Sequence, residues 1–297
     1  MPSYSPEVTA TVLITGAGGQ VGNELAQATC PHRLIALQRE QLDICDAGQV
    51  EAAVLDYRPD IVINAAAYTQ VDQAENNPDL AFAINRDGVG NLASACKRAD
   101  IPMLHLSTDY VFDGNSERAY RESDKIAPLG VYGASKAAGE EVLRATLTRY
   151  LILRTSWVFS ATGTNFVKTM LRLGAQREHL SIVDDQRGCP TSARSIASVL
   201  LRIAGRYLAG EKIDWGIYHF CNRPETTWFG FAAEIFRQAG GYDHLEIKPI
   251  PTSEYPTPAK RPFNSVLSCT KIESEFAINP VNWEDELDDV VKRLARD

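Results

Sequence analysis

Several absences limit what this chain can be. No apolar run approaches the roughly eighteen residues of a membrane-spanning helix, and residues 1–9 lack the basic and apolar segments of a signal peptide. Basic residues are the minority, 30 against 38 acidic ones, so the net charge of −8 offers no positive field for nucleic acid or acidic lipid. We therefore expect a cytoplasmic protein that binds neither membrane nor nucleic acid.

Paired cysteines are also missing. The six cysteines are scattered, form no C-x-x-C pair and have no clustered histidines beside them. This usage is typical of reduced, mostly buried thiols in a cytosolic protein. We expect neither a disulfide framework nor a zinc site.

The residues that are present favour an α/β fold. Across residues 11–155, short apolar runs alternate with longer amphipathic ones, which is typical of βαβ units. We predict a Rossmann-type doubly wound parallel sheet with a smaller C-terminal α/β substrate lobe. Residues 1–160 would form the nucleotide-binding domain, with a return segment near 215–240, and residues 161–297 mainly the lobe. Strands are expected at 11–15, 33–38, 61–64, 103–107 and 150–155.

Other elements are less regular. The clearest helix is expected at 74–99, broken or kinked near its start by Pro78. A helix from Asn165 to Gly174, a small strand at 181–184 and a last helix at 283–295 follow in the lobe. The proline-rich residues 249–262 predict a loop or linker.

A glycine-rich turn directly follows the first strand. Gly16 would allow the tight turn, Gly19 a close approach to phosphate oxygens, and Gly22 packing of the helix that opens at Gln20 and Val21. The spacing is G-x-x-G-x-x-G rather than G-x-G-x-x-G. A strand, such a turn and a helix together predict a pyrophosphate-binding site.

A second motif carries acid–base chemistry. Tyr132 and Lys136 are four residues apart and would lie on one face of a helix. We expect the ammonium to lower the pKa of the phenol, and Ser107 or Thr108, at the end of a strand, to hold the same substrate oxygen. Alone, Tyr-x-x-x-Lys is also typical of an ordinary surface helix; the glycine turn upstream makes the catalytic interpretation specific.

The sequence resembles the extended short-chain dehydrogenase/reductases and, within them, the dTDP-4-dehydrorhamnose reductases. The resemblance covers nearly the whole chain. Ser-Thr-Asp-Tyr-Val-Phe-Asp-Gly at 107–114 and Arg-Thr-Ser-Trp-Val-Phe at 154–159 narrow it to the reductases. It is also carried by the glycine turn and by residues 62–72, 128–136, 165–167, 185–191 and 261–265.

The resemblance implies NAD(P)H-dependent reduction of the 4-keto group of dTDP-4-dehydro-L-rhamnose to dTDP-L-rhamnose. Tyr132 would donate the proton, Lys136 would bond the nicotinamide ribose, and Thr108 would orient the carbonyl. Substrate contacts are implied at Thr69, Val71, Thr108, Asp109, Tyr132 and Trp157. Arg187 or Arg261 would meet a phosphate.

The end of the second strand indicates the cofactor. Arg39 stands where an NAD-preferring site usually has Asp or Glu, so NADPH should be accepted and preferred, with NADH a second cofactor. A solvated loop position is the alternative for Arg39. The resemblance places Asp43 and Ile44 near the adenine, and the small residues after the third strand, Ala65, Ala66 and Ala67, beside the cofactor.

One departure concerns magnesium. The resemblance includes family members that form a dimer bridged by magnesium through two acidic side chains. Glu24 matches the first of these acids, but Arg194 stands at the position of the second. An arginine cannot ligate the metal, so we expect no metal and a monomer or weak homodimer. Two functional alternatives stay open: another nucleotide-sugar reductase or epimerase, and a non-catalytic regulatory subunit like that of methionine adenosyltransferase.

Overall fold

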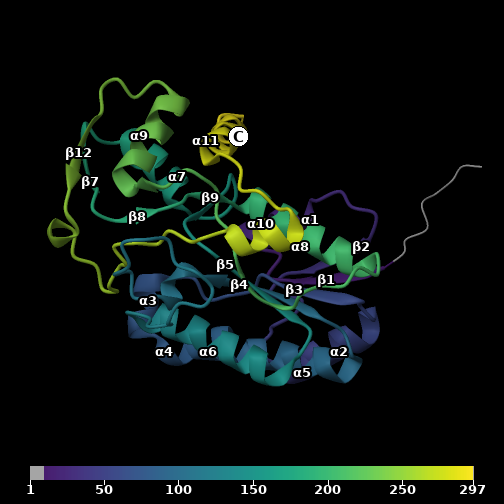
Figure 1. Cartoon of the computed structure of the whole chain (residues 1–297). Helices are drawn as coiled ribbons and strands as arrows, with labels where there is room; N and C mark the ends of the chain where they lie inside the picture. The colour runs from purple at the N-terminus through teal and green to yellow at the C-terminus, as the bar shows by residue number, and fades with distance from the viewer. Residues whose placement is uncertain (1–9, 297) are drawn as a thin grey trace, which may run out of the picture.

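A six-stranded parallel sheet forms the centre of the computed structural model, which describes residues 10–296 (Figure 1). Residues 1–9, on which the absence of a signal peptide is argued, lie outside the described residues. The strand order is β10-β5-β4-β3-β1-β2. The strands are β1 (Thr11–Thr15), β2 (Arg33–Leu37), β3 (Ile61–Asn64), β4 (Met103–Thr108), β5 (Tyr150–Thr155) and β10 (Gly216–His219).

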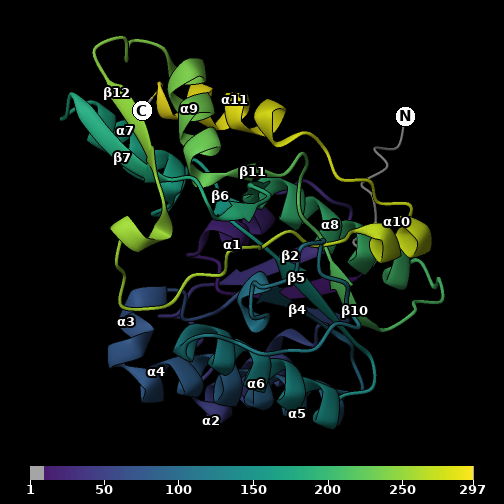
Figure 2. The same ribbon diagram turned by 60° about the vertical axis from the view of Figure 1, so that its left-hand side comes forward.

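The predicted doubly wound sheet is confirmed. All its strand pairs are parallel, and both faces are covered by helices, which explains why its strands are apolar runs rather than alternating ones. Helices α2 (Ala47–Tyr57), α5 (Val89–Ala99) and α6 (Val131–Thr146) lie on one face. On the other face lie α1 (Gln20–Ala26), α8 (Ala193–Leu208) and α10 (Thr270–Phe276) (Figure 2).

The helix expected at 74–99 is broken at Pro78 as predicted, and it has a further interruption that was not predicted. It is four pieces: α3 (Val71–Asn76), α4 (Pro78–Phe82), a π-helical turn η1 (Ala83–Gly88) and α5. Pro78 begins α4 because its missing N–H is tolerated in a first helical turn. The π turn holds Asn85, which is fully buried. Its carboxamide accepts from Tyr68 N at 2.8 Å and donates to Ser135 Oγ of α6 at 2.9 Å.

A second group of helices and strands, all of them later in the chain than β5, packs around a core of its own (Figure 2). Helices α7 (Phe166–Gly174), α9 (Trp228–Ala239) and α11 (Trp283–Leu294) enclose an aromatic core with Phe159, Phe231 and Trp283. Parallel strands β7 (His179–Val183) and β12 (Glu246–Ile250) flank it. The loop expected from residue 249 is therefore wrong at its start, because Pro249 lies in β12. That strand pairs on one side only, where a residue without N–H is tolerated.

Smaller elements complete the chain. The short pairs are β6 (Val158–Phe159) with β9 (Thr191–Ser192), and β8 (Arg187–Gly188) with β11 (Thr226–Thr227). Two 3-10 turns are η2 (Asp109–Val111) and η3 (Thr252–Glu254). The strand β10 returns to the main sheet as expected, pairing with β5. The division of the chain into domains at residue 160 stays a prediction.

A buried ion pair fixes α6 against the sheet. Arg154 of β5 and Glu140 of α6 meet at 2.6 Å, with each side chain 1% exposed. Ser107 Oγ of β4 donates to the same carboxylate at 2.6 Å, and the Arg154 guanidinium lies over the Phe112 ring at 5.0 Å. Both charges therefore have partners, which is the condition for burying them.

We predict that Glu140→Gln lowers the free energy of unfolding by about 3–5 kcal/mol, because Arg154 would keep a buried charge without its counterion. The measurement is urea unfolding followed by circular dichroism. The matched control is Asp288→Asn, which breaks the exposed Lys292–Asp288 pair and should cost less than about 1 kcal/mol. Equal losses in the two variants would contradict the assignment.

Candidate active site

A cavity of about 710 Å³ opens where the strand order reverses, between β1 and β3. In open α/β sheets, ligands bind at this switch point, beyond the carboxyl ends of the strands. The structure brings together here most of the residues expected at the cofactor. Its lining includes Gly16, Gly19, Arg39, Asp43, Ile44, Ala65, Ala66 and Ala67, together with Thr69.

The glycine turn is built by close backbone approach. Gly16 has φ +76°, and a Cβ there would lie 2.5 Å from Ala66 N. The backbone segments that follow β1 and β3 therefore approach each other this closely only with a glycine at position 16. Gly22 lies against the Gly16 carbonyl, where a Cβ would come within 2.0 Å. By contrast, a Cβ at Gly19 would meet no atom nearer than 3.4 Å. The exposed Gly19 backbone therefore faces open space at the cavity.

The first residues of α1 do not line this cavity. Val21 is buried in the core. Gln20 Oε1 instead accepts from Asn165 Nδ2 at 2.9 Å, and Asn165 caps α7 by accepting from Lys168 N. Gln20 therefore connects the glycine turn to the start of α7 by a hydrogen bond.

Arg39 is free to meet a ligand. Its side chain is 68% exposed and lies 3.7 Å from Asp43, too far for a tight pair. The sequence interpretation missed Glu40, a carboxylate that also lines the cavity. The lining residues that were not named as site residues are Gly18, Gln38, Leu42, Tyr68, Gln70, Gln73, Asn77, Leu80 and Ile84.

Thr108 and Tyr132 meet at the end of β4, the strand that pairs with β3. The Thr108 side chain lies close enough to the Tyr132 hydroxyl to lower the pKa of the phenol, and its own hydroxyl donates to Asp109 Oδ1 at 3.0 Å. A Cβ at Gly133 would come within 2.2 Å of Tyr110 O, so a glycine there lets α6 approach the end of β4. Of the two candidate hydroxyls, the structure places Thr108 at the phenol. Ser107 faces Glu140 instead.

The pKa of Tyr132 is raised rather than lowered as expected, and the effect of Lys136 on it stays a prediction. Burial raises the pKa of Tyr132 above its ordinary value, and the side chain that opposes this rise is Thr108. Lys136 is 2% exposed, and its Nζ donates to Leu106 O at 2.7 Å. Burial also lowers the pKa of Lys136 to about 8, so its charge is itself disfavoured. Tyr132 therefore stays protonated at neutral pH.

Asp109 adds a buried carboxyl group. It is 4% exposed, and its Oδ2 has no hydrogen-bond partner among residues 10–296. Burial raises its pKa to about 6. A buried oxygen without a partner is costly, so it is suited to accept from a bound hydroxyl.

The remaining predicted substrate residues are dispersed. Thr69 lines the cavity, and Val71 begins α3. Trp157 lies elsewhere: its ring stacks on Trp228 with centroids 3.6 Å apart, against the core of α7, α9 and α11. Its backbone is left-handed, with φ 50°. Trp157 is only partly buried, so its predicted contact with the substrate stays a prediction.

The two arginines proposed for phosphate differ. Arg187 is half exposed and pairs with Glu225 at 2.6 Å. Arg261 is more buried, pairs with Asp72 at 2.6 Å and lies beside Tyr110. Its Nη1 is buried without a hydrogen-bond partner in the described part of the chain. Arg261 is therefore the arginine with an unused donor.

The two positions implied for magnesium, Glu24 and Arg194, each pair with another charged side chain. Glu24 accepts from Arg293 at 3.0 Å, and Arg194 pairs with Asp289 at 3.2 Å. Within residues 10–296, no three His, Cys, Asp or Glu side chains are grouped for a metal ion. The Glu24 and Asp289 carboxylates are thus each paired with an arginine guanidinium.

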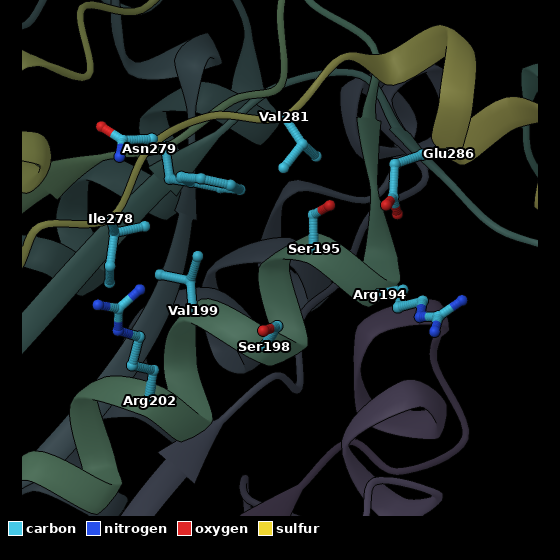
Figure 3. A pocket seen from close by; sticks show the side chains of 10 residues that line it. Arg194, Ser195, Ser198, Val199, Arg202, Ile278, Asn279, Val281 and Glu286 are labelled. Atoms are coloured by element: carbon cyan, nitrogen blue, oxygen red, sulfur yellow. The ribbon is translucent and has the colours of Figure 1, made fainter.

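A second cavity, of about 280 Å³, lies outside α8 (Figure 3). Ser195, Ser198 and Arg202 rise from α8 toward the segment that carries Asn279. It contains neither the glycine turn nor Tyr132, so it is separate from the candidate active site.

Over the described residues, no helix has the length and apolar character to cross a membrane.

Comparison with known proteins agrees with this geometry. The family model "RmlD substrate binding domain" matches residues 10–296. A dTDP-4-dehydrorhamnose reductase of Aggregatibacter actinomycetemcomitans is 46% identical over 288 residues, 95% of this chain and 98% of the relative.

Solved structures agree as well. A dTDP-4-dehydrorhamnose reductase from Clostridium acetobutylicum has a TM-score of 0.90 at 36% identity, covering 96% of this chain and 99% of that one. One from Bacillus anthracis, in complex with NADP, has a TM-score of 0.88 at 36% identity, covering 95% and 98%. Because the family model and these relatives cover nearly the whole chain, it belongs to the dTDP-4-dehydrorhamnose reductase family of the extended short-chain dehydrogenase/reductases.

Proposed function

We propose that this protein reduces the 4-keto group of dTDP-4-dehydro-L-rhamnose to dTDP-L-rhamnose with NADPH. The observation that carries the proposal is the closeness of Thr108 and Tyr132 at the end of β4, the strand that pairs with β3, whose end lines the glycine-turn cavity. Asn85 links the two regions, because its carboxamide bonds both Tyr68 of the cavity and Ser135 of α6. The family membership supplies the substrate class.

Tyr132 is the proton donor in this proposal. A donor must hold its proton until charge develops on the substrate oxygen, and burial keeps the Tyr132 hydroxyl protonated. Thr108 bonds the same oxygen and orients the carbonyl. Lys136, one turn along the same helix face, stabilises the phenolate that is left and bonds the nicotinamide ribose.

Asp109 and Arg261 hold the substrate in place. The free Oδ2 of Asp109 accepts from a sugar hydroxyl, and the unpaired Nη1 of Arg261 donates to a phosphate oxygen. These two assignments use buried polar atoms that otherwise have no partner. They account for the cost of keeping those atoms buried.

The cofactor fits the cavity between β1 and β3. NADPH, when bound, supplies the hydride. The Gly19 backbone would approach the pyrophosphate, and Arg39 would pair with the 2′-phosphate. The Bacillus anthracis relative, solved with NADP, supports this choice.

We predict that Tyr132→Phe loses turnover by about 10²- to 10⁴-fold, the typical contribution of a general acid. NADPH binding should be retained, because the ring keeps its packing against Tyr110. The measurements are NADPH oxidation with dTDP-4-dehydrorhamnose and fluorescence titration of NADPH. Tyr255→Phe, at an exposed position, is the control and should keep full activity; retained turnover in Tyr132→Phe would remove Tyr132 from the acid role.

We predict that Arg39→Ala raises KM for NADPH by about tenfold, the loss of roughly 1.4 kcal/mol from a charge-assisted contact. KM for NADH should change less than about twofold, because NADH has no 2′-phosphate to meet the guanidinium. Steady-state kinetics with both cofactors give the ratio. Arg98→Ala, an exposed arginine on α5, serves as control. An unchanged ratio would place Arg39 in the solvated loop.

A further inference from the structure

A line of buried polar side chains runs from β1 to the catalytic lysine. It passes from Thr15 through Asn64 of β3 and His105 of β4 to Lys136 of α6. The first three are fully buried, and Lys136 is 2% exposed. Neither the proton donor nor the cavity accounts for these contacts.

The orientation of Asn64 is fixed by a backbone donor. Ala66 N donates to Asn64 Oδ1 at 3.0 Å, and Thr15 Oγ1 donates to the same oxygen at 2.7 Å. A flipped carboxamide would set its NH₂ group against the Ala66 N–H. Asn64 Nδ2 therefore faces His105 Nδ1, at 3.1 Å.

This contact selects one tautomer of His105. An amide NH₂ group can only donate, so Nδ1 must accept and carries no hydrogen. A doubly protonated ring would set its Nδ1–H against Nδ2, and burial also keeps the pKa of His105 well below its usual range. The neutral ring therefore carries its hydrogen on Nε2.

The Nε2–H group points at Lys136. The distance from His105 Nε2 to Lys136 Nζ is 3.4 Å, and Nζ also donates to Leu106 O at 2.7 Å. An ammonium has donors only, whereas a neutral amine has a lone pair that accepts. The Nε2–H group can therefore donate to the lone pair of the neutral amine, whereas the ammonium offers it no acceptor.

We propose that Asn64 and His105 hold a fixed N–H donor against Lys136 that favours its neutral amine, which makes His105 a positioning residue that sets the pH at which Lys136 gains its charge. The kinetic consequence of this proposal rests on the proposed function, in which the charged Lys136 supports the Tyr132 phenolate. The tautomer of His105 does not depend on that function.

Other charges near Lys136 are accounted for. Glu140, one turn further along α6, favours the ammonium, but it is paired with Arg154 of β5 and accepts from Ser107 of β4. Tyr132 lies one turn earlier and stays protonated. Burial lowers the pKa of Lys136 to about 8, in the same direction as the His105 donor. The donor adds to burial and is opposed by Glu140.

The rate of reduction depends on the charge of Lys136. Reduction needs the ammonium to support the phenolate, so the rate falls as pH rises through the pKa of Lys136. Removing the Nε2–H donor relieves the opposition to the ammonium and raises that pKa. The alkaline limb of the pH profile should then move to higher pH.

Two variants at residue 105 test this. His105→Met fills a similar volume without a donor, whereas His105→Gln keeps an N–H group near the position of Nε2. We expect the alkaline limb of kcat to move up by about one pH unit in His105→Met, the size of a typical environmental shift, and to stay near the wild-type position in His105→Gln. Equal shifts in both variants, or none in either, would overturn the proposal.

A measurement without turnover separates this proposal from the proposed function. Nitrogen NMR of wild-type protein labelled with ¹⁵N-histidine distinguishes a bare from a protonated ring nitrogen, and the signals lost in His105→Gln identify His105 among the five histidines. We expect a bare Nδ1 and a protonated Nε2 from pH 6 to 9. A protonated Nδ1 would overturn the proposal even in an active reductase, and the expected tautomer would stand even if another sugar proved to be the substrate.

Discussion

The site depends on the need to satisfy polar groups that are buried inside the sheet. Strand β4 carries His105 and Ser107 on the face toward α6, because alternate residues of a strand share a face. Each meets a polar partner on α6: His105 meets Lys136 and Ser107 meets Glu140. An unpartnered buried polar group costs about 1–3 kcal/mol. These contacts therefore fix the position of α6, and with it the position of Tyr132, relative to the end of β4.

Much of the fold could be predicted because its signals are local. The buried strands are continuous apolar runs, and the glycine turn is a contiguous motif. The broken helix around Asn85 could not be foreseen in the same way. Its π turn places one carboxamide between Tyr68 and Ser135, which are far apart in sequence, and such a tertiary demand leaves no mark in helical periodicity.

The candidate site shows the same division. Motif positions such as Gly16 and Ala66 lie together at the cavity because both end adjacent parallel strands. The pKa of Tyr132 was missed because spacing along a helix says nothing of burial or of where an ammonium points. The stacking of Trp157 on Trp228 could not be predicted either, because Trp228 lies on α9, far from Trp157 in the sequence. His105 had one visible signal, a polar residue within an apolar strand.

The return of β10 to the main sheet has a consequence for how this protein is made. Its pairing with β5 supplies the last strand, and Phe220 N donates to Arg154 O at 2.9 Å. A nascent chain that has released only its first five strands therefore presents β5 as an open edge, a surface prone to pairing with other chains. Ribosomal synthesis must pass residue 219 before β5 gains its second neighbour, so a fragment that ends near residue 160 would leave β5 as an edge strand.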